Sequence, residues 1–197
     1  MYGPVYYSRL ASGSMSYLLI ACRTLLLGVF LAALAGKVRR RAAYDGFVTS
    51  LRALNVLPPR LAGVAAAVVT AAEAAIVVLL IVPVTGPAGF LLAAVLLTTF
   101  TSGIAVAVRR GTTAPCACFG VSVTPLGRVH VVRNLLLLAV AGAGLAFADA
   151  GGGTEFAGVV LAVAAALVTL VPVLRLDDLT ALFSRARAVI PNRGFCS

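Results

Sequence analysis

Several stretches of this chain are apolar for about twenty residues, and this feature constrains its fold more than any other. A helix needs roughly 20 apolar residues to cross the hydrocarbon core of a bilayer. The chain is 61% hydrophobic and only 11% charged, whereas a soluble domain is about a quarter charged. The sequence therefore predicts an integral membrane protein.

The apolar runs predict helices, because a helix satisfies its backbone hydrogen bonds internally in lipid. They lack the alternation expected of membrane β-barrel strands. The predicted fold class is an all-α integral membrane protein, a polytopic helical bundle with a core of four transmembrane helices, a fifth span and short interfacial helices. The expected spans are residues 15–36, 61–83, 86–108, 129–148 and 155–174. The bundle of residues 15–174 lies between an amino-terminal arm (1–14) and an amphipathic tail (175–197).

The basic residues are concentrated in alternate connections between the apolar runs. The net charge of +10 could suggest nucleic-acid binding, but residues placed in this way fix topology and meet anionic lipid instead. We therefore expect a lipid bilayer as a partner and no nucleic acid. The positive-inside rule predicts a multi-pass protein with its amino terminus outside and its carboxyl terminus in the cytoplasm. This orientation puts the connection of residues 109–128 at the cytoplasmic face.

The basic connection after the first span contains "YDGFVTSLRALNVLPP", residues 44–59. Phe47, Leu51 and Leu54 follow helical spacing, and the two prolines then end the pattern. This arrangement is typical of a short amphipathic helix in the membrane interface. The tail has a similar pattern, so both segments are predicted to contact the membrane surface.

A few polar residues lie within the apolar runs. Glu73 is near the middle of the second run, where a carboxylate is costly and normally faces the bundle interior. It is either a structural acid, paired with a base or held neutral, or a group that handles protons or a quinone. Lys37 either snorkels to the interface or pairs with Glu73. Arg23 is expected to snorkel to the opposite surface, and the hydroxyls of residues 98–102 to bond between helices.

The stretch "APCACFG", residues 114–120, holds two of the four cysteines. Arg110 and Arg128 flank Cys116 and Cys118, and nearby cations favour the reactive thiolate. A bridge between the two would need a turn and would carry strain, which favours thiol exchange. A metal site and inert thiols are the other interpretations; a metal site would lack a fourth ligand even with His130.

His130 lies in the same connection as the cysteine pair, so it is either structural or able to tune a thiol. Cys22 lies in the first apolar run. We expect it to be a buried residue that takes no part in exchange.

The order of these segments resembles the MauE family, within the broader MauE/DoxX group. The matching elements are "LAGKVRR", "TAAEAAIVVLL", "RRGTTAPCACFG" and "VVRNLLLL", and the resemblance covers about residues 25–145. It implies a redox-associated helical bundle in the bacterial inner membrane, in which Cys116 and Cys118 form the reactive pair. The positions that match the family pattern without an assigned role are Lys37, Glu73, Arg133 and Asn134.

The family is linked to methylamine utilisation and to maturation of the disulfide-rich small subunit of methylamine dehydrogenase, beside a thioredoxin-like partner. The resemblance thus implies a membrane thiol–disulfide redox protein, a candidate oxidoreductase that assists disulfide formation. Quinone is a candidate cofactor, and no metal is expected. The alternative is a non-enzymatic scaffold that holds a thioredoxin-like protein or a client with disulfides.

The resemblance and the charge distribution disagree on one point. Protein disulfides persist outside the cytoplasm, yet the basic residues place the cysteine pair at the cytoplasmic face. Electron transfer across the membrane, a different number of helices or a different pathway would each reconcile the two.

Overall fold

The structure is a computed structural model that describes residues 4–54, 58–110, 128–148 and 154–188. Within these residues it consists of helices and short connections, with no β-strand. The elements are α1 (Pro4–Val38), α2 (Arg41–Ala53), a 3₁₀ turn η1 (Pro59–Leu61), α3 (Ala62–Ile81), α4 (Gly86–Arg109), α5 (Arg128–Ala146) and α6 (Phe156–Ala188). The predicted all-α fold class is confirmed.

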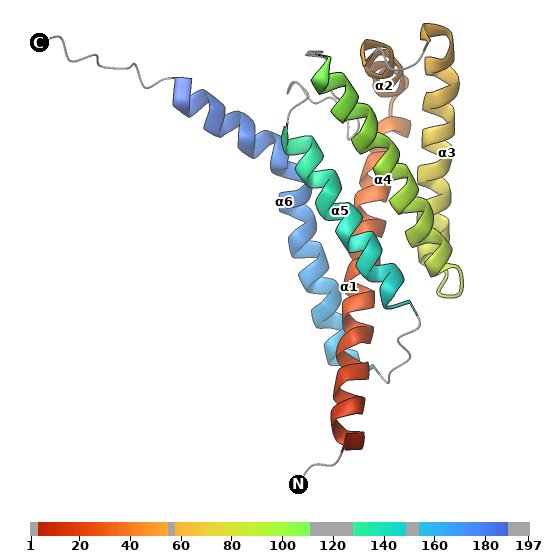
Figure 1. Ribbon diagram of the computed structural model, residues 1–197, viewed down its shortest axis with the longest axis vertical. Helices are drawn as coiled ribbons and strands as arrows, with labels where there is room; N and C mark the ends of the chain where they lie inside the picture. Colours follow the sequence, from red (N-terminus) through yellow and green to blue (C-terminus); the bar gives the residue numbers. More distant parts are fainter. Residues whose placement is uncertain (1–3, 55–57, 111–127, 149–153, 189–197) are drawn as a thin grey trace, which may run out of the picture.

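The long helices α1, α3, α4, α5 and α6 run side by side along the bundle, with α2 beside one end of it (Figure 1). Helix α1 is central, because α2, α3, α5 and α6 all pack against it. Helix α4 closes the bundle by packing on α3 and α5. As a result, α1 can present side chains to several neighbours at once.

Four described helical segments are long and apolar enough to cross a membrane, and they correspond to four of the five expected spans. They are Gly13–Val38, Pro59–Ile81, Gly86–Arg109 and Phe156–Arg175. Most of α5 forms a further, shorter apolar helix, His130–Ala146. The whole of α5 has 19 residues and is about 28 Å long, close to the thickness of the hydrocarbon core, about 30 Å. The chain is therefore a multi-pass membrane protein.

Two helices extend beyond the expected spans. Helix α1 begins at Pro4, within the predicted arm, and α6 continues to Ala188, within the predicted tail. Hydropathy locates only the apolar part of a helix, so polar extensions escape it. Pro172 lies inside α6, and the ribbon bends away from the bundle in its second half (Figure 1), as proline in a helix interior can cause.

The contact between α1 and α6 depends on two glycines. A side chain at Gly28 would meet the Leu170 methyl groups at 2.7 and 3.3 Å, and a side chain at Gly158 would collide with the Tyr17 ring. Both distances are shorter than ordinary van der Waals contact. Small residues let helices approach closely in membranes, where packing drives association.

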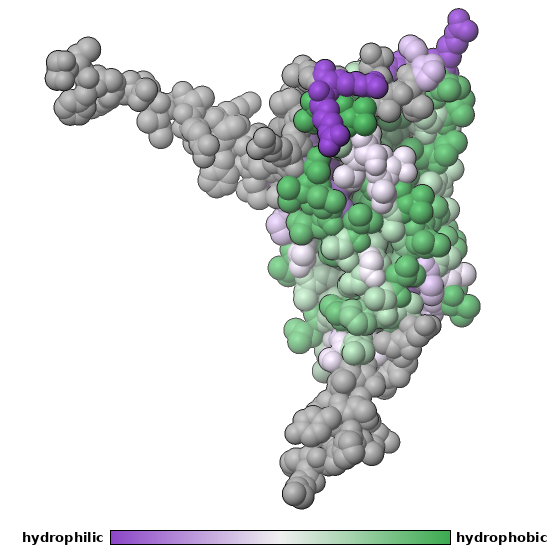
Figure 2. Space-filling model, viewed as in Figure 1, coloured by the Kyte–Doolittle hydropathy of each residue, from purple (hydrophilic) through white to green (hydrophobic). Residues whose placement is uncertain are grey.

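Most of the exposed arginines of the described segments gather at one end of the bundle. Seven arginines of the described segments are exposed there: Arg39, Arg40, Arg41, Arg52, Arg60, Arg109 and Arg110. Figure 2 shows strongly hydrophilic side chains at this end and mainly apolar side chains below it. We call this end the basic end. On the outward faces below it, Val68 is 62% and Val168 is 73% exposed, which suits contact with lipid.

Candidate functional site

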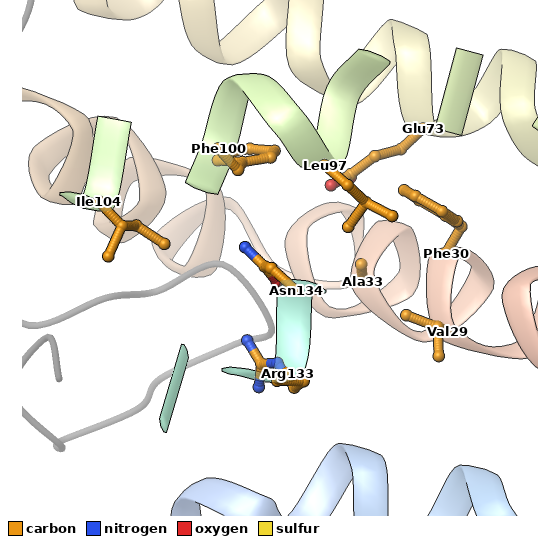
Figure 3. A pocket seen from close by; sticks show the side chains of 9 residues that line it. All are labelled: Val29, Phe30, Ala33, Glu73, Leu97, Phe100, Ile104, Arg133 and Asn134. Carbon is orange, nitrogen blue, oxygen red and sulfur yellow. The ribbon is translucent and has the colours of Figure 1, made fainter. Parts of the chain in front are cut away.

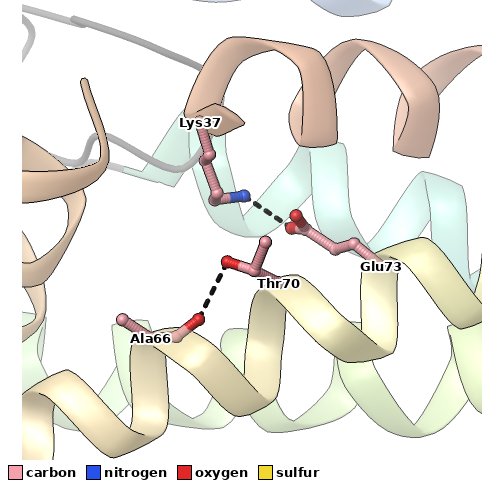
Figure 4. A network of polar contacts seen from close by, with 4 residues as sticks. All are labelled: Lys37, Ala66, Thr70 and Glu73. Carbon is pink, nitrogen blue, oxygen red and sulfur yellow. Dashed lines mark hydrogen bonds and ion pairs between the residues drawn. The ribbon is translucent and has the colours of Figure 1, made fainter. Parts of the chain in front are cut away.

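A buried ion pair joins α1 to α3. Lys37 Nζ lies 2.6 Å from Glu73 Oε1 and donates a hydrogen bond to it (Figure 4). The two side chains are 1% and 4% exposed. Lys37 is in the last turn of α1, yet it turns into the bundle instead of snorkelling to the surface. Of the two interpretations of Lys37, the structure shows the pairing with Glu73 and not the snorkelling to the interface.

Helix α2 covers this ion pair. The Lys37 ammonium lies 4.6 Å from the centroid of the Phe47 ring, a cation–π distance. Phe47 is only 1% exposed, so the apolar side of the amphipathic helix packs inside the protein. On α3, Thr70 donates to Ala66 O at 2.9 Å, within its own helix (Figure 4).

A cavity opens beside Glu73, where side chains from four helices converge (Figure 3). Its polar residues are Glu73 of α3 and Arg133 and Asn134 of α5. All three are buried, with 3 to 5% exposure. The apolar lining comes from α1 and α4: Val29, Phe30, Ala33, Leu97, Phe100 and Ile104.

The cavity is small. It has about 20 Å³ of free space, and a single water needs roughly 10–15 Å³ on this measure. In this conformation it therefore accommodates water but no quinone ring. Glu73 Oε2 is buried and has no hydrogen-bond partner among the described residues. A buried polar atom in this situation is normally satisfied by ordered water.

Three other predicted site residues, on α4 and α5, lie within the described part of the chain. His130 is buried on α5, with 3% exposure, but it does not line the cavity. Arg110 caps the end of α4 and is exposed, and Arg128 is the first residue of α5. Cys116 and Cys118 lie outside the described residues, and their predicted role stays a prediction.

Cys22 is buried in α1 with 7% exposure, as predicted. Among the described residues, no group of three or more His, Cys, Asp and Glu could hold a metal ion.

Arg23 has a role that sequence reasoning missed. Its Nε donates to the carbonyl oxygen of Leu80, in the last turn of α3. The last carbonyls of a helix lack partners within the helix, and in lipid such groups are costly. Arg23 thus satisfies one end of α3 instead of only snorkelling to the surface. The available signal in the sequence was an arginine within an apolar run. The sequence does not show which helices are neighbours, so the end of α3 could not be identified as its partner.

The hydroxyls of α4 also differ from expectation. Thr98, Thr99, Thr101 and Ser102 each donate to the carbonyl four residues earlier in α4, at 2.7 to 2.8 Å. The expected hydrogen bonds to other helices are replaced by bonds within the same helix, a common alternative for Ser and Thr.

Comparison with known proteins identifies one family. The sequence model described as methylamine utilisation protein MauE matches residues 15–147, about two-thirds of the 197-residue chain. The match spans most of α1 and all of α2 to α5, so it contains the ion pair and the cavity. No curated protein and no solved structure matches the chain.

Proposed function

The chain belongs to the MauE family, and from this premise we propose that it is a membrane thiol–disulfide redox protein acting through Cys116 and Cys118. Its role would be to assist disulfide formation in, or maturation of, a partner protein. By the family's link, that client would be the small subunit of methylamine dehydrogenase, with a thioredoxin-like protein as a further partner.

One observation carries the proposal: the described residues on both sides of the cysteine stretch lie at the same end of the bundle as the buried ion pair. Helix α4 ends at Arg109 and α5 begins at Arg128, both at the basic end (Figure 1). Cys116 follows the first of these ends by seven residues, and Cys118 precedes the second by ten. Connectivity thus supports a redox site at the basic end.

The charges of this end favour the chemistry. Arg109 and Arg110 are exposed at the end of α4, and Arg133 is buried on the second turn of α5. Cations stabilise a thiolate, which is the nucleophile in disulfide exchange. The same excess of basic residues supports a cytoplasmic location of the basic end in a bacterial inner membrane.

Each round of exchange needs no reactant other than the cysteine pair and the partner's two cysteines. The thiolate of one cysteine attacks the partner's disulfide, forms a mixed disulfide and releases one partner thiolate. The second cysteine attacks the mixed disulfide and releases the other thiolate, which leaves Cys116 and Cys118 bridged. Two electrons and two protons pass from the pair to the partner, and the reverse sequence oxidises the partner. After the pair has oxidised a partner, a quinone would accept the two electrons and re-form the bridge; after the pair has reduced a partner, a reduced thioredoxin-like protein would return two electrons to it.

The test uses the purified full chain and oxidised glutathione as a probe disulfide. We expect one single variant, Cys116→Ser or Cys118→Ser, to retain a stable mixed disulfide, because the resolving thiol is absent. The other single variant and the double variant should form none at these positions. Cys22→Ala is the matched control, since Cys22 is buried in α1, and it should react like the wild type. Peptide mass mapping locates the adduct.

A scaffold protein would give a different result. Its thiol labelling would not change across physiological redox potentials, and the double cysteine variant would support client maturation as well as the wild type. Either result would overturn the redox proposal in favour of a structural role.

A further inference from the structure

The bend of α6 leaves one face of α1 uncovered near the basic end. The two helices pack closely at Gly28, where a side chain would meet Leu170. Pro172 follows two residues later, and beyond it the ribbon of α6 moves away from the bundle (Figure 1). Ala35 lies seven residues after Gly28, on the same helical face, and it is exposed. Helix α6 therefore covers this face at Gly28 but not at Ala35.

The uncovered part of α1 is apolar. Leu31 and Val38 flank Ala35 at helical spacing, and they are 51% and 65% exposed. We call Leu31, Ala35 and Val38 the open face. All three residues belong to the apolar span Gly13–Val38, so in a bilayer the open face is in contact with hydrocarbon chains.

Three arginines follow the open face without a break. Arg39, Arg40 and Arg41 are all exposed, and within the described part of the chain none of them forms an ion pair. The backbone N–H of Arg39 donates to Ala35 O at 3.0 Å, which is the spacing of a helical hydrogen bond. Arg39 thus lies one turn beyond Ala35 on the same side of α1. A cluster of cations stands at the end of an exposed apolar face.

We propose that the open face and the three arginines together bind an anionic phospholipid. Its acyl chain would lie along the open face, and its phosphate would lie at the arginines. Arginine forms bidentate hydrogen bonds with phosphate oxygens, and basic clusters just beyond a membrane span attract anionic lipids. Three cations favour a headgroup with net negative charge over a zwitterionic one.

A second copy of the chain is a less suitable occupant of this face. A symmetric contact places the same patch of both copies together, and here it would bring six arginines to one place. A phospholipid instead offers a negative group and a hydrocarbon chain in the order in which α1 presents arginines and apolar residues. The inference goes beyond the proposed redox function and is independent of it, since it involves neither cysteine of the pair.

Tryptophan fluorescence tests the inference, because the chain contains no tryptophan. Leu31→Trp places a reporter on the open face, eight residues before Arg39. Val68→Trp is the matched control: Val68 is 62% exposed on α3, eight residues after Arg60. Both reporters are thus about 12 Å along a helix from an arginine of the basic end, but only Leu31 lies below three consecutive arginines.

The full chain is reconstituted in phosphatidylcholine vesicles that contain a minor fraction of brominated phosphatidylglycerol, which quenches nearby tryptophan. Brominated phosphatidylcholine in the same fraction provides the reference. One basic residue near an anionic surface strengthens binding about fivefold. We therefore expect the preference for phosphatidylglycerol, measured by quenching, to be at least about fivefold greater at Leu31→Trp than at Val68→Trp.

Neutral variants identify the headgroup contact. In the Leu31→Trp background, Arg39→Gln should lower the preference for phosphatidylglycerol about fivefold. Arg52→Gln removes an exposed arginine of α2 and should leave the preference unchanged. Both substitutions are at exposed positions, so the helix content measured by circular dichroism should stay the same.

Three results would overturn the inference. An equal preference at Leu31→Trp and Val68→Trp would show that the open face meets bulk lipid only. An unchanged preference in Arg39→Gln would show that the arginine does not hold the headgroup. Quenching of Val68→Trp but not of Leu31→Trp by both brominated lipids would show that protein, such as a second copy, covers the open face.

Discussion

Lys37 and Glu73, 36 residues apart in the chain, meet inside the bundle with 2.6 Å between Nζ and Oε1. The pair fixes the end of α1 against the middle of α3. Since both side chains are almost fully buried, neither charge can turn to water when the other is removed. The stability of the protein should therefore depend on the two side chains jointly.

Removal of one partner should destabilise the protein far more than removal of both. Breaking a buried ion pair typically costs about 3–5 kcal/mol, because the other charge stays buried. We expect costs of this size for Lys37→Met and for Glu73→Gln, and a double variant that costs clearly less than their sum. Chemical unfolding in detergent measures the cycle. Strictly additive costs would show that the two side chains are not coupled.

Phe47 should matter more than its place on a surface helix suggests. Its ring is buried over Lys37, so Phe47→Ala removes both packing and a cation–π contact, at an expected cost of about 3–5 kcal/mol. Phe47→Leu keeps most of the packing and should lose about 0.5–2 kcal/mol. Arg52→Ala, an exposed change on the same helix, is the control. Equal thermal stability of all three variants would refute this role.

Alanine substitution at two glycines of α5 should change the stability of the protein in opposite directions. A side chain at Gly144 would overlap the Phe90 ring of α4, with its Cζ at only 2.5 Å, whereas Gly142 has open space. Gly144→Ala should cost about 1–3 kcal/mol through overpacking. Gly142→Ala should instead add about 0.5–1 kcal/mol, because glycine is a poor helix former. Thermal unfolding of the two variants compares them, and the same sign for both would be contrary to the structure.

The two ends of the bundle should lie on opposite sides of the membrane. Val84 is 89% exposed in the connection between α3 and α4, and Arg40 is exposed at the basic end. In a cysteine-free background, an impermeant maleimide added to intact cells should label Val84→Cys and not Arg40→Cys. Permeabilised cells should show labelling of both. The reverse pattern would invert the proposed orientation.

The helices themselves were predictable from the sequence, but their ends were less so. The second and third expected spans, residues 61–83 and 86–108, differ by at most two residues at either end from α3 and α4. The amphipathic pattern around Phe47 located α2. Hydropathy could not show that α1 starts at Pro4. It identifies apolar runs, and the residues before position 15 lie outside such a run.

The site was only partly predictable for a different reason. A carboxylate in an apolar run must face the interior, so Glu73 and its pairing with Lys37 could be anticipated. Helical periodicity gives the face of each helix but not its neighbours. Only the fold shows that Arg133 and Asn134 share a cavity with Glu73, and that Arg23 reaches Leu80.

The fit of Gly28 against Leu170 also constrains how the protein is made. Helix α1 leaves the ribosome well before α6, so this contact cannot form until α6 has also been synthesised. Until then the glycine face of the central helix must be covered by lipid or by the insertion machinery. The central helix therefore gains its α6 neighbour only after α2 to α5 have been made, from a segment that lies beyond the residues matched by the family model.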